Sequence, residues 1–357
     1  MSTYILVGIF VPIRNIMNYT IFGNTGLRIS ELCLGTMTFG NAWGWGAEKS
    51  TSQKIFDLYT AKGGNFIDTA NLYSNGLSEK YIGEFIKSDR HHYVVGTKFT
   101  LKDTFDNPPK DPNKSGMHKK NMIRSVEASL KRLNTEFIDI LWVHAWDEFT
   151  SVQELMKNLE QLVLSGKVLH IAISDSPAWN VSQANMLAEL KGWSSFAGLQ
   201  VEYSLIQRSA ERDLIPMANK LGLTVTPWSP LGGGILSGKY KTGKEKGRAN
   251  QGSRLTPKRL QIAQTVAQVA KDIGAQPSQV AIKWMMQKHN NLVPIVGART
   301  IQQAKSNLGV LDIQLPEEAM QQLDEVSAIE LGFPHDFLKS DNVKSIVYSD
   351  TYDRIKR

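Results

Sequence analysis

Short apolar runs alternate with helix-like segments along most of this chain, and the runs end at polar or aromatic side chains. In chain order, the residues at these ends are Asp68, Lys98, His144, Ser174, Gln200 and Trp228. Neighbouring members lie 26 to 30 residues apart, except for the 46 residues between Lys98 and His144. A strand with its crossover helix takes about 30 residues, so the spacing indicates one βα unit for each of these residues.

Counted in full, the apolar runs predict eight parallel strands, at 32–34, 65–69, 93–98, 137–143, 168–174, 196–201, 223–226 and 293–296. Helical periodicity marks 48–62, 78–88, 118–133, 152–165, 181–190, 210–221, 257–273, 277–288 and 302–309. This alternation predicts a (β/α)8 TIM barrel, whose active site lies where the strands end. An open, doubly wound sheet is the alternative, but no glycine-rich phosphate turn follows the first strand. The insertion 101–117 explains the long interval and is expected to cover the active-site face.

Four polar side chains converge on that face, namely Asp68, Lys98, His144 and Tyr73, which follows Asp68 by five residues. A phenol has a free pKa of about 10, and a buried Lys98 ammonium is expected to lower the pKa of Tyr73. Asp68 would keep the lysine charged, while His144 would hold a carbonyl or relay a proton. These groups suit protonation of a carbonyl oxygen while hydride reaches its carbon. The alternative is a helix-capping Asp68 and a Tyr73 packed under a loop.

With these residues in place, the sequence resembles the aldo-keto reductase superfamily, in particular bacterial and fungal members related to the potassium-channel β subunits. The supporting stretches are LGTMTFG, NFIDTANLYSNGLSEKYIGE, VVGTKF, DILWVHAWD, IAISDS, LQVEYSLIQR, TPWSPLGGGILSGKY and PIVGARTIQQAKSNLG. The resemblance runs from about Tyr19 to about Leu331 and implies that Asp68, Tyr73, Lys98 and His144 form the catalytic tetrad. It also implies that the hairpin 19–30 closes the bottom of the barrel.

A hydride carrier is expected at the glycine-rich stretch after Trp228, whose ring can stack on nicotinamide while backbone amides cradle pyrophosphate. A core tryptophan followed by a flexible loop is the alternative. The resemblance implies NADP(H), bound by Thr36, Met37, Asp68, Ser174, Asp175, Gln200, Trp228, Ser229, Pro230, Leu231, Gly232, Lys239, Gly297, Arg299, Gln303 and Asn307. An arginine on the 2′-phosphate favours NADP over NAD.

Two positions depart from the family pattern. Asp175 stands where the family commonly has Asn, and a carboxylate cannot donate to the nicotinamide carboxamide. Ser306 stands where Glu is frequent, which removes one expected adenine contact. The substrate site is expected at Trp43, Tyr73, His144 and Trp146, with Trp45 as a further aromatic candidate, although tryptophans packed in loops would look the same. Apolar walls favour an aldehyde or ketone with a hydrophobic or aryl body.

Composition excludes several other classes of protein. The single Cys33 rules out an internal disulfide and a multi-cysteine metal site, and the seven histidines do not fall at ligand spacings, so no metal is expected. The net charge is +7, but the basic residues are scattered and occur in runs no longer than two. Neither nucleic acid nor a membrane surface is therefore expected as a partner. We expect a cytoplasmic monomer or weak homo-oligomer.

The chain divides into an extension at 1–16, a barrel domain at 17–331 and a tail at 332–357. The extension has an apolar stretch too short to span a bilayer, and we interpret it as a misassigned start; a weak targeting segment or an extra packed strand are the alternatives. The tail is expected to be packed or disordered, and in the resembling family such a segment often borders the substrate pocket.

The leading functional hypothesis is an NADPH-dependent oxidoreductase that reduces aldehydes or ketones to alcohols with Tyr73 as proton donor. The alternative is a cofactor-binding, redox-sensing regulatory subunit with slow turnover, as in the channel-β relatives. A third class, a barrel hydrolase, needs two facing carboxylates at strand ends, and Asp68 alone is evident.

Overall fold

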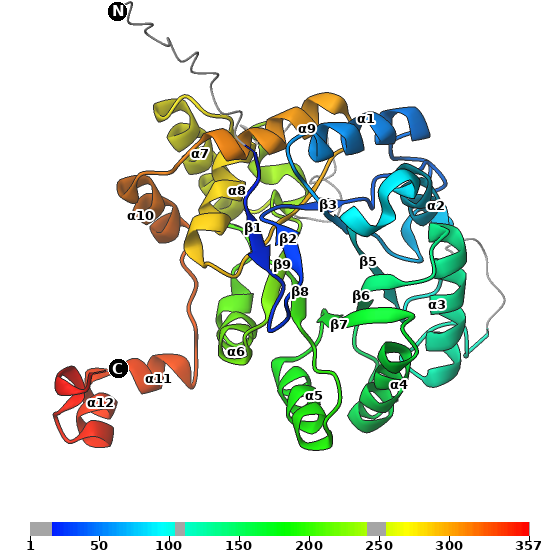
Figure 1. The fold of residues 1–357 in the computed structure, drawn as a ribbon. Coiled ribbons are helices and arrows are strands. Elements are labelled where there is room, and N and C mark those ends of the chain that lie inside the picture. Colours follow the sequence, from blue (N-terminus) through cyan, green and yellow to red (C-terminus); the bar gives the residue numbers. More distant parts are fainter. Residues whose placement is uncertain (1–15, 104–110, 241–254, 357) are drawn as a thin grey trace, which may run out of the picture.

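Eight parallel strands form the centre of the computed structural model, which describes residues 16–103, 111–240 and 255–356 (Figure 1). The strands are β3 (Cys33–Gly35), β4 (Phe66–Asp68), β5 (Val94–Phe99), β6 (Ile138–Val143), β7 (Val168–Ser174), β8 (Gly198–Glu202), β9 (Thr224–Trp228) and β10 (Ile295–Gly297). They pair in chain order from β3 to β9, and β10 lies beside β3. A bridge from Val225 in β9 to Leu292, just before β10, completes the ring. The predicted barrel is confirmed, and the open-sheet alternative is wrong.

Helices follow most strands and surround the barrel (Figure 1). Their bounds are α1 (Lys49–Thr60), α2 (Leu77–Phe85), α3 (Lys119–Leu133), α4 (Val152–Leu164), α5 (Ala178–Lys191), α6 (Leu214–Leu221), α7 (Pro257–Asp272), α8 (Pro277–Lys288), α9 (Ile301–Leu308), α10 (Glu317–Val326), α11 (His335–Lys339) and α12 (Asp341–Tyr348). In α4, Ser151 caps the first turn by accepting from the Glu154 amide, and Leu155 and Leu159 are buried one turn apart.

An antiparallel hairpin, β1 (Tyr19–Ile21) and β2 (Arg28–Ser30), closes the end of the barrel at which the strands begin. Phe22 of its turn is fully buried and meets Phe66 and Trp142 edge-on, at ring-centroid distances of 6.1 and 6.2 Å. A Cβ at Gly198 would lie 2.5 Å from the Phe22 ring, so glycine is needed where the hairpin enters. The predicted hairpin plug is therefore confirmed.

Two of the predicted helices are each replaced by an α-helix and a separate 3-10 segment. The predicted helix 78–88 ends at Phe85 and continues as a 3-10 segment, Lys87–His92. The predicted helix 210–221 begins with a separate 3-10 turn, Ser209–Glu211, before α6. In the insertion, the Gly116 amide donates to the Thr100 carbonyl and closes the loop base, whereas 104–110 lie outside the described residues. Residues 1–15 of the predicted extension also lie outside them.

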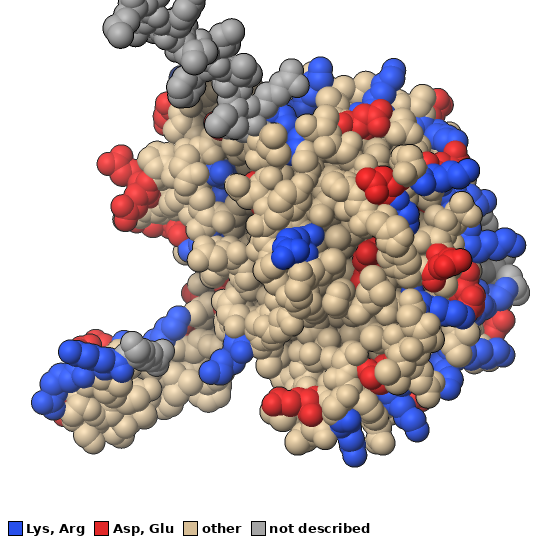
Figure 2. All heavy atoms as spheres, in the orientation of Figure 1, with Lys and Arg blue, Asp and Glu red and all other residues tan. Residues whose placement is uncertain are grey.

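The C-terminal segment, predicted as a packed or disordered tail, contains α11, α12 and a final turn, Tyr352–Arg354. Figure 1 shows these elements reaching away from the barrel, and Figure 2 shows them as a separate lobe. Across 16–103, 111–240 and 255–356, no helix combines the length and hydrophobicity that crossing a membrane requires.

Candidate active site

The predicted tetrad assembles where β4, β5 and β6 end. Lys98, fully buried in β5, donates from Nζ to Asp68 Oδ2 at 2.5 Å, to the Thr69 carbonyl at 2.8 Å and to Tyr73 Oη at 3.1 Å. Asp68 ends β4 and is itself buried. His144 follows β6, and its ring lies edge-on to that of Tyr73 at a centroid distance of 6.1 Å. Residues from three separate stretches of the sequence thus meet in one cluster.

The Lys98 ammonium determines the direction of its hydrogen bond with the Tyr73 hydroxyl. An ammonium has three N–H bonds and no acceptor, and those of Lys98 are directed at three separate oxygens. Tyr73 Oη therefore accepts from the lysine, which leaves the phenolic proton free to point elsewhere. The amide of Gln200 donates from Nε2 to Asp68 Oδ1 at 3.0 Å, so both carboxylate oxygens are occupied. The arrangement holds a buried ion pair and presents a phenol O–H.

Burial alters the pKa values of this cluster. Burial lowers the pKa of Lys98, but the Asp68 charge and Tyr73 outweigh it, and the net shift is upward, so Lys98 remains a cation. The pKa of Tyr73 is raised as well, because desolvation exceeds the lowering by the Lys98 charge. The expected net lowering of the Tyr73 pKa is therefore not present in the protein alone: the lysine acts in the expected direction, and burial prevails.

His144 is neutral at physiological pH. Burial, and secondarily the Lys98 charge, hold the pKa of its imidazole well below the usual value. Its Nδ1 is buried and has no hydrogen-bond partner among the described residues. A neutral imidazole can donate a hydrogen bond to a carbonyl oxygen without acting as a strong acid.

The ends of β7 and β9 carry the expected nicotinamide-binding residues. Ser174 Oγ is buried and unpartnered within the described parts of the chain, which leaves it available to a ligand amide. Asp175 has left-handed backbone geometry, with φ of 40°, and its Oδ1 accepts from Trp228 Nε1 at 3.0 Å. The indole of Trp228 is half-buried and tethered by this bond. The unpartnered Ser174 hydroxyl fits a nicotinamide carboxamide, and the tethered Trp228 indole fits the nicotinamide ring.

The glycine-rich stretch differs from the expected phosphate cradle. It forms a 3-10 segment, Gly232–Ser237, in which Gly233 and Gly234 have positive φ. The amides of Gly232, Gly233 and Gly234 already donate to the Ser229 carbonyl, Ser229 Oγ and the Leu231 carbonyl, at 2.8, 3.2 and 2.9 Å. Phosphate binding through these three amides would require the loop to exchange its internal bonds. Pro230, also in the expected set, is buried at the start of the loop.

The expected adenosine site has an ordered backbone and an exposed cation. The Arg299 amide donates to Gln303 Oε1 at 2.9 Å, and Asn307 Nδ2 donates to the Gly297 carbonyl at 3.1 Å. These bonds join the end of β10 to the first turns of α9. The Arg299 side chain is exposed, as is Lys239, which follows the glycine-rich segment.

Thr36 and Met37 differ in their surroundings. Thr36 is fully buried, and its hydroxyl donates to the Asp68 carbonyl at 2.9 Å, so it holds the end of β4 in place. Met37 is 39% exposed at the barrel rim, where a ligand can reach it.

Two contributors to the site were not predicted from the sequence. The Thr69 carbonyl, which accepts from Lys98, is a backbone group and has no side-chain signal. Asn75, which accepts from Trp43, was indicated only by its place in a polar loop.

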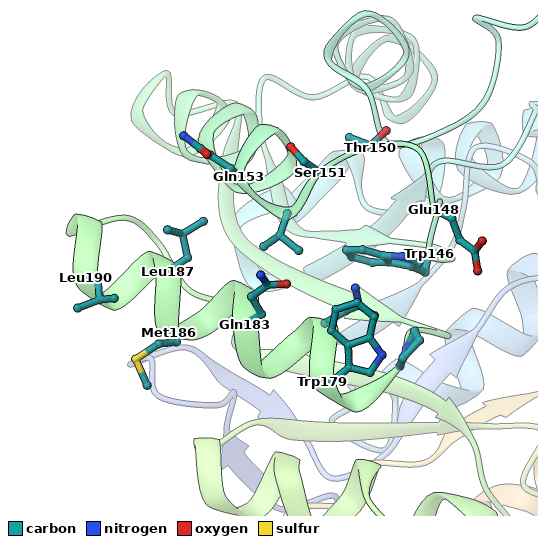
Figure 3. Close-up of a pocket in the computed structure, with 13 residues that line it drawn as sticks. Trp146, Glu148, Thr150, Ser151, Gln153, Trp179, Gln183, Met186, Leu187 and Leu190 are labelled. Carbon is teal, nitrogen blue, oxygen red and sulfur yellow. The ribbon is translucent and has the colours of Figure 1, made fainter.

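Aromatic rings line one side of Tyr73. Trp43 lies edge-on to Tyr73 at 6.5 Å and beside Trp45 at 5.5 Å, and its Nε1 donates to Asn75 Oδ1. Trp146, the other predicted wall, lines a groove between α4 and α5 instead (Figure 3).

The described residues contain no cluster of three or more His, Cys, Asp or Glu side chains that could hold a metal ion.

The chain is similar in sequence to known proteins. The profile described as "Aldo/keto reductase family" matches residues 31–328. A norsolorinic acid reductase of Aspergillus flavus is 36% identical over 324 residues, covering 88% of this chain and 82% of that protein. An aryl-alcohol dehydrogenase (NADP+) of Phanerodontia chrysosporium is 37% identical over 333 residues, covering 87% of this chain and 86% of that protein.

Proposed function

The chain belongs to the aldo/keto reductase family, and from this premise we propose that it reduces aldehydes or ketones to alcohols with NADPH, using Tyr73 as proton donor. When bound, the nicotinamide supplies the hydride for the carbonyl carbon. The protein's own task is then to hold the carbonyl, deliver one proton to its oxygen and exclude water from the reacting atoms.

One observation carries this proposal: Lys98 donates to Tyr73 rather than accepting from it. An ammonium has no lone pair, so the phenolic proton has no acceptor on the lysine and can be given to a substrate oxygen. As that proton leaves, negative charge develops on Tyr73 Oη, 3.1 Å from the Lys98 cation. The buried cation stabilises this charge, which lowers the barrier even though the resting pKa is high.

Asp68 and His144 have separate roles in this proposal. Asp68 binds Lys98 and Gln200 through different oxygens, so it fixes the lysine in position and keeps it charged. His144 is held neutral by burial and by the Lys98 charge, which lower its pKa. It therefore orients the carbonyl by hydrogen bonding, and Tyr73 alone donates the proton.

The substrate class we propose is an aryl aldehyde or aryl ketone, with the corresponding alcohol as product. Relatives at 36 and 37% identity are named for norsolorinic acid and for aryl alcohols. Trp43 and Trp45 offer flat apolar surfaces next to Tyr73, suited to stacking on an aryl ring. The exposed Arg299 cation, beside the ordered turn of α9, supports NADP over NAD.

The test combines a substrate panel with one variant. Aryl aldehydes, aryl ketones and aliphatic carbonyls of equal size are mixed with the protein and NADPH or NADH, and the absorbance of the reduced cofactor is followed. Tyr73→Phe keeps the ring but removes the proton, so kcat should fall by about 10²–10⁴. Quenching of tryptophan fluorescence should show nearly unchanged NADPH binding. Near-normal turnover by Tyr73→Phe would overturn the proton assignment, and tight NADPH binding without turnover of any carbonyl would favour the regulatory-subunit alternative.

A further inference from the structure

Residues 332–356, here called the C-terminal arm, form a separate lobe (Figure 2). Large apolar side chains of this arm are exposed. The exposed fractions are 84% for Phe333, 55% for Phe337 and Leu338, 71% for Ile346 and 60% for Val347. Phe333 and Phe337 lie beside each other at a ring distance of 6.0 Å, and Ile346 and Val347 flank the same face of α12 as Val343. The arm therefore exposes apolar side chains both at α11 and on α12.

These helices are too short to be stable without a packing partner. The helices α11 and α12 have 5 and 8 residues, whereas isolated helices below about 12–15 residues are marginal in water. Within the described arm, Val343 is the one buried apolar side chain. Capping by Ser340, which accepts from the Val343 amide, shows that the local sequence specifies the helix. The missing stabilisation must come from a surface that the arm covers.

The barrel has a matching uncovered surface, the α4–α5 groove, with a volume of about 920 Å³ (Figure 3). Trp179, Met186 and Leu190 follow one stripe of α5 and are 67%, 56% and 75% exposed. Figure 3 shows Trp146 and Trp179 at one end of the groove and Leu187 and Leu190 towards the other. A groove of this kind accepts the apolar face of an amphipathic helix.

We propose that the C-terminal arm of one molecule docks in the α4–α5 groove of a second copy, in a reciprocal, two-fold symmetric dimer. Exposed apolar side chains of this size bury roughly 100 Å² each, so the eight named side chains of arm and groove, present twice in the dimer, together bury about 1,600 Å². Stable interfaces bury about 1,200–2,000 Å², so the exchange is large enough to hold a dimer. Reciprocity closes the symmetry and leaves no open end for further association.

The position of the arm favours a second copy over the same molecule. Arg212, just before α6, donates from Nε and Nη2 to the Glu330 carbonyl and so fixes the chain where the arm begins. From that point the arm extends away from the barrel on the α6 side, whereas the groove lies on the other side of α5, towards α4 (Figure 1). The arm's apolar surface is thus accessible to another molecule.

Docking would also place the arm next to the catalytic face. Trp146 lines the groove and follows His144 by two residues, and its amide donates to the Asp175 carbonyl at 3.4 Å. The partner's arm would therefore cover one side of the loop that carries His144. The dimer itself does not depend on the proposed reaction, so it can be tested without a substrate.

The first test measures mass in solution by sedimentation or light scattering over a range of concentrations. The full chain should have twice the chain mass. An arm variant, Ile346→Glu with Val347→Glu, and a groove variant, Met186→Glu with Leu190→Glu, should each be monomeric. Mixing the two should restore a weaker dimer, because the groove variant's intact arm fits the arm variant's intact groove. Ile123→Glu, an exposed apolar position on α3, is the control and should remain dimeric.

The second test remains informative if an acidic variant fails to fold. A copy carrying Ile346→Cys is mixed with a tagged copy carrying Met186→Cys, in a chain whose natural Cys33 is buried. Oxidation should join the two copies in a disulfide. A monomeric full chain at all concentrations, no rescue on mixing, or a disulfide that forms only within a chain carrying both cysteines would overturn the proposal; the last result would mean that the arm packs on its own barrel.

Discussion

At the carboxyl end of the barrel, the Asp68–Lys98 pair is buried and hydrogen-bonded throughout, whereas the residues expected to hold the cofactor are more open. That second set, here called the cofactor rim, comprises 228–234, Lys239 and 297–307. Lys98 has an oxygen for each of its N–H bonds, while the Arg299 side chain is exposed to solvent. The difference indicates a division of labour: the fold fixes the groups expected to react, whereas the exposed Arg299 side chain is accessible to a ligand.

The strongest test of this comparison is Lys98→Met. Removing the ammonium leaves the Asp68 carboxylate buried without its cation, so the free energy of unfolding should fall by about 3–5 kcal/mol. Turnover should fall by about 10²–10⁴, because the charge that stabilises the Tyr73 phenolate is lost. Urea unfolding and steady-state kinetics measure the two effects, and the double variant with Tyr73→Phe should be scarcely less active than either alone.

Lys167→Met provides the matched control for that experiment. Lys167 is paired with Glu127, and both side chains are about half exposed. Such surface pairs contribute about 0–1 kcal/mol, so this variant should unfold almost like the native protein. If Lys98→Met were no less stable than Lys167→Met, the buried pair would not be the fixed element that the comparison requires.

At the cofactor rim, Arg299→Glu should change binding without changing stability. The exposed guanidinium has little effect on the free protein, but the substitution places an anion near the expected 2′-phosphate. A charge-assisted hydrogen bond contributes about 1.5–3 kcal/mol, so the Kd for NADPH should rise roughly tenfold or more, with a much smaller rise for NADH. Fluorescence titration with both cofactors measures this. Lys305→Glu, the same charge reversal on α9, is the control, and equal weakening of NADPH and NADH by Arg299→Glu would remove Arg299 from that site.

The pH dependence of stability separates the two regions further. Burial and the Lys98 charge hold the His144 pKa well below its unfolded value of about 6.5. In the pH range between the lowered pKa and about 6.5, His144 binds a proton in the unfolded chain but not in the folded protein. The free energy of unfolding therefore falls as pH decreases below about 6.5. His144→Gln should make that decline shallower, by at most about 1.4 kcal/mol per pH unit. Unfolding is measured at neutral and acidic pH, with His91→Gln, at an exposed position, as control; identical slopes for all three proteins would contradict the assignment.

The smallest expected effect is at Asp175, whose carboxylate accepts a hydrogen bond from Trp228 of the cofactor rim. Asp175→Asn keeps an oxygen that can accept from the indole but removes the negative charge. Oxidised nicotinamide is cationic and the reduced ring is neutral, so the carboxylate should favour NADP+. We expect the ratio of the Kd for NADP+ to the Kd for NADPH to rise a few-fold in the variant. A constant ratio would show that the carboxylate does not act on the nicotinamide ring.

Much of the fold could be predicted because its signals are local. Apolar runs and helical periodicity located the strands of the barrel, and the polar residues at the strand ends identified Asp68, Lys98 and His144 before any distance was known. The parallel barrel then brings those strand ends together by its geometry alone. The predicted helix 210–221 is a 3-10 turn followed by α6 in the structure. Periodicity does not distinguish such a turn from the start of a helix, so the boundary was not predicted.

The sequence by itself determined which residues stand at the carboxyl end of the barrel, whereas the tertiary structure alone decided their pKa values and hydrogen bonds. The net rise of the Tyr73 pKa, the direction of the Lys98 hydrogen bonds and the internal bonding of the Gly232–Gly234 amides were not predicted. Each of these properties depends on burial and on neighbours from several elements, so it cannot be predicted from one stretch of the chain. The pairing of Asp175 with Trp228 is another example, because Asp175 follows β7 and Trp228 ends β9, so the two residues meet only when the barrel is formed.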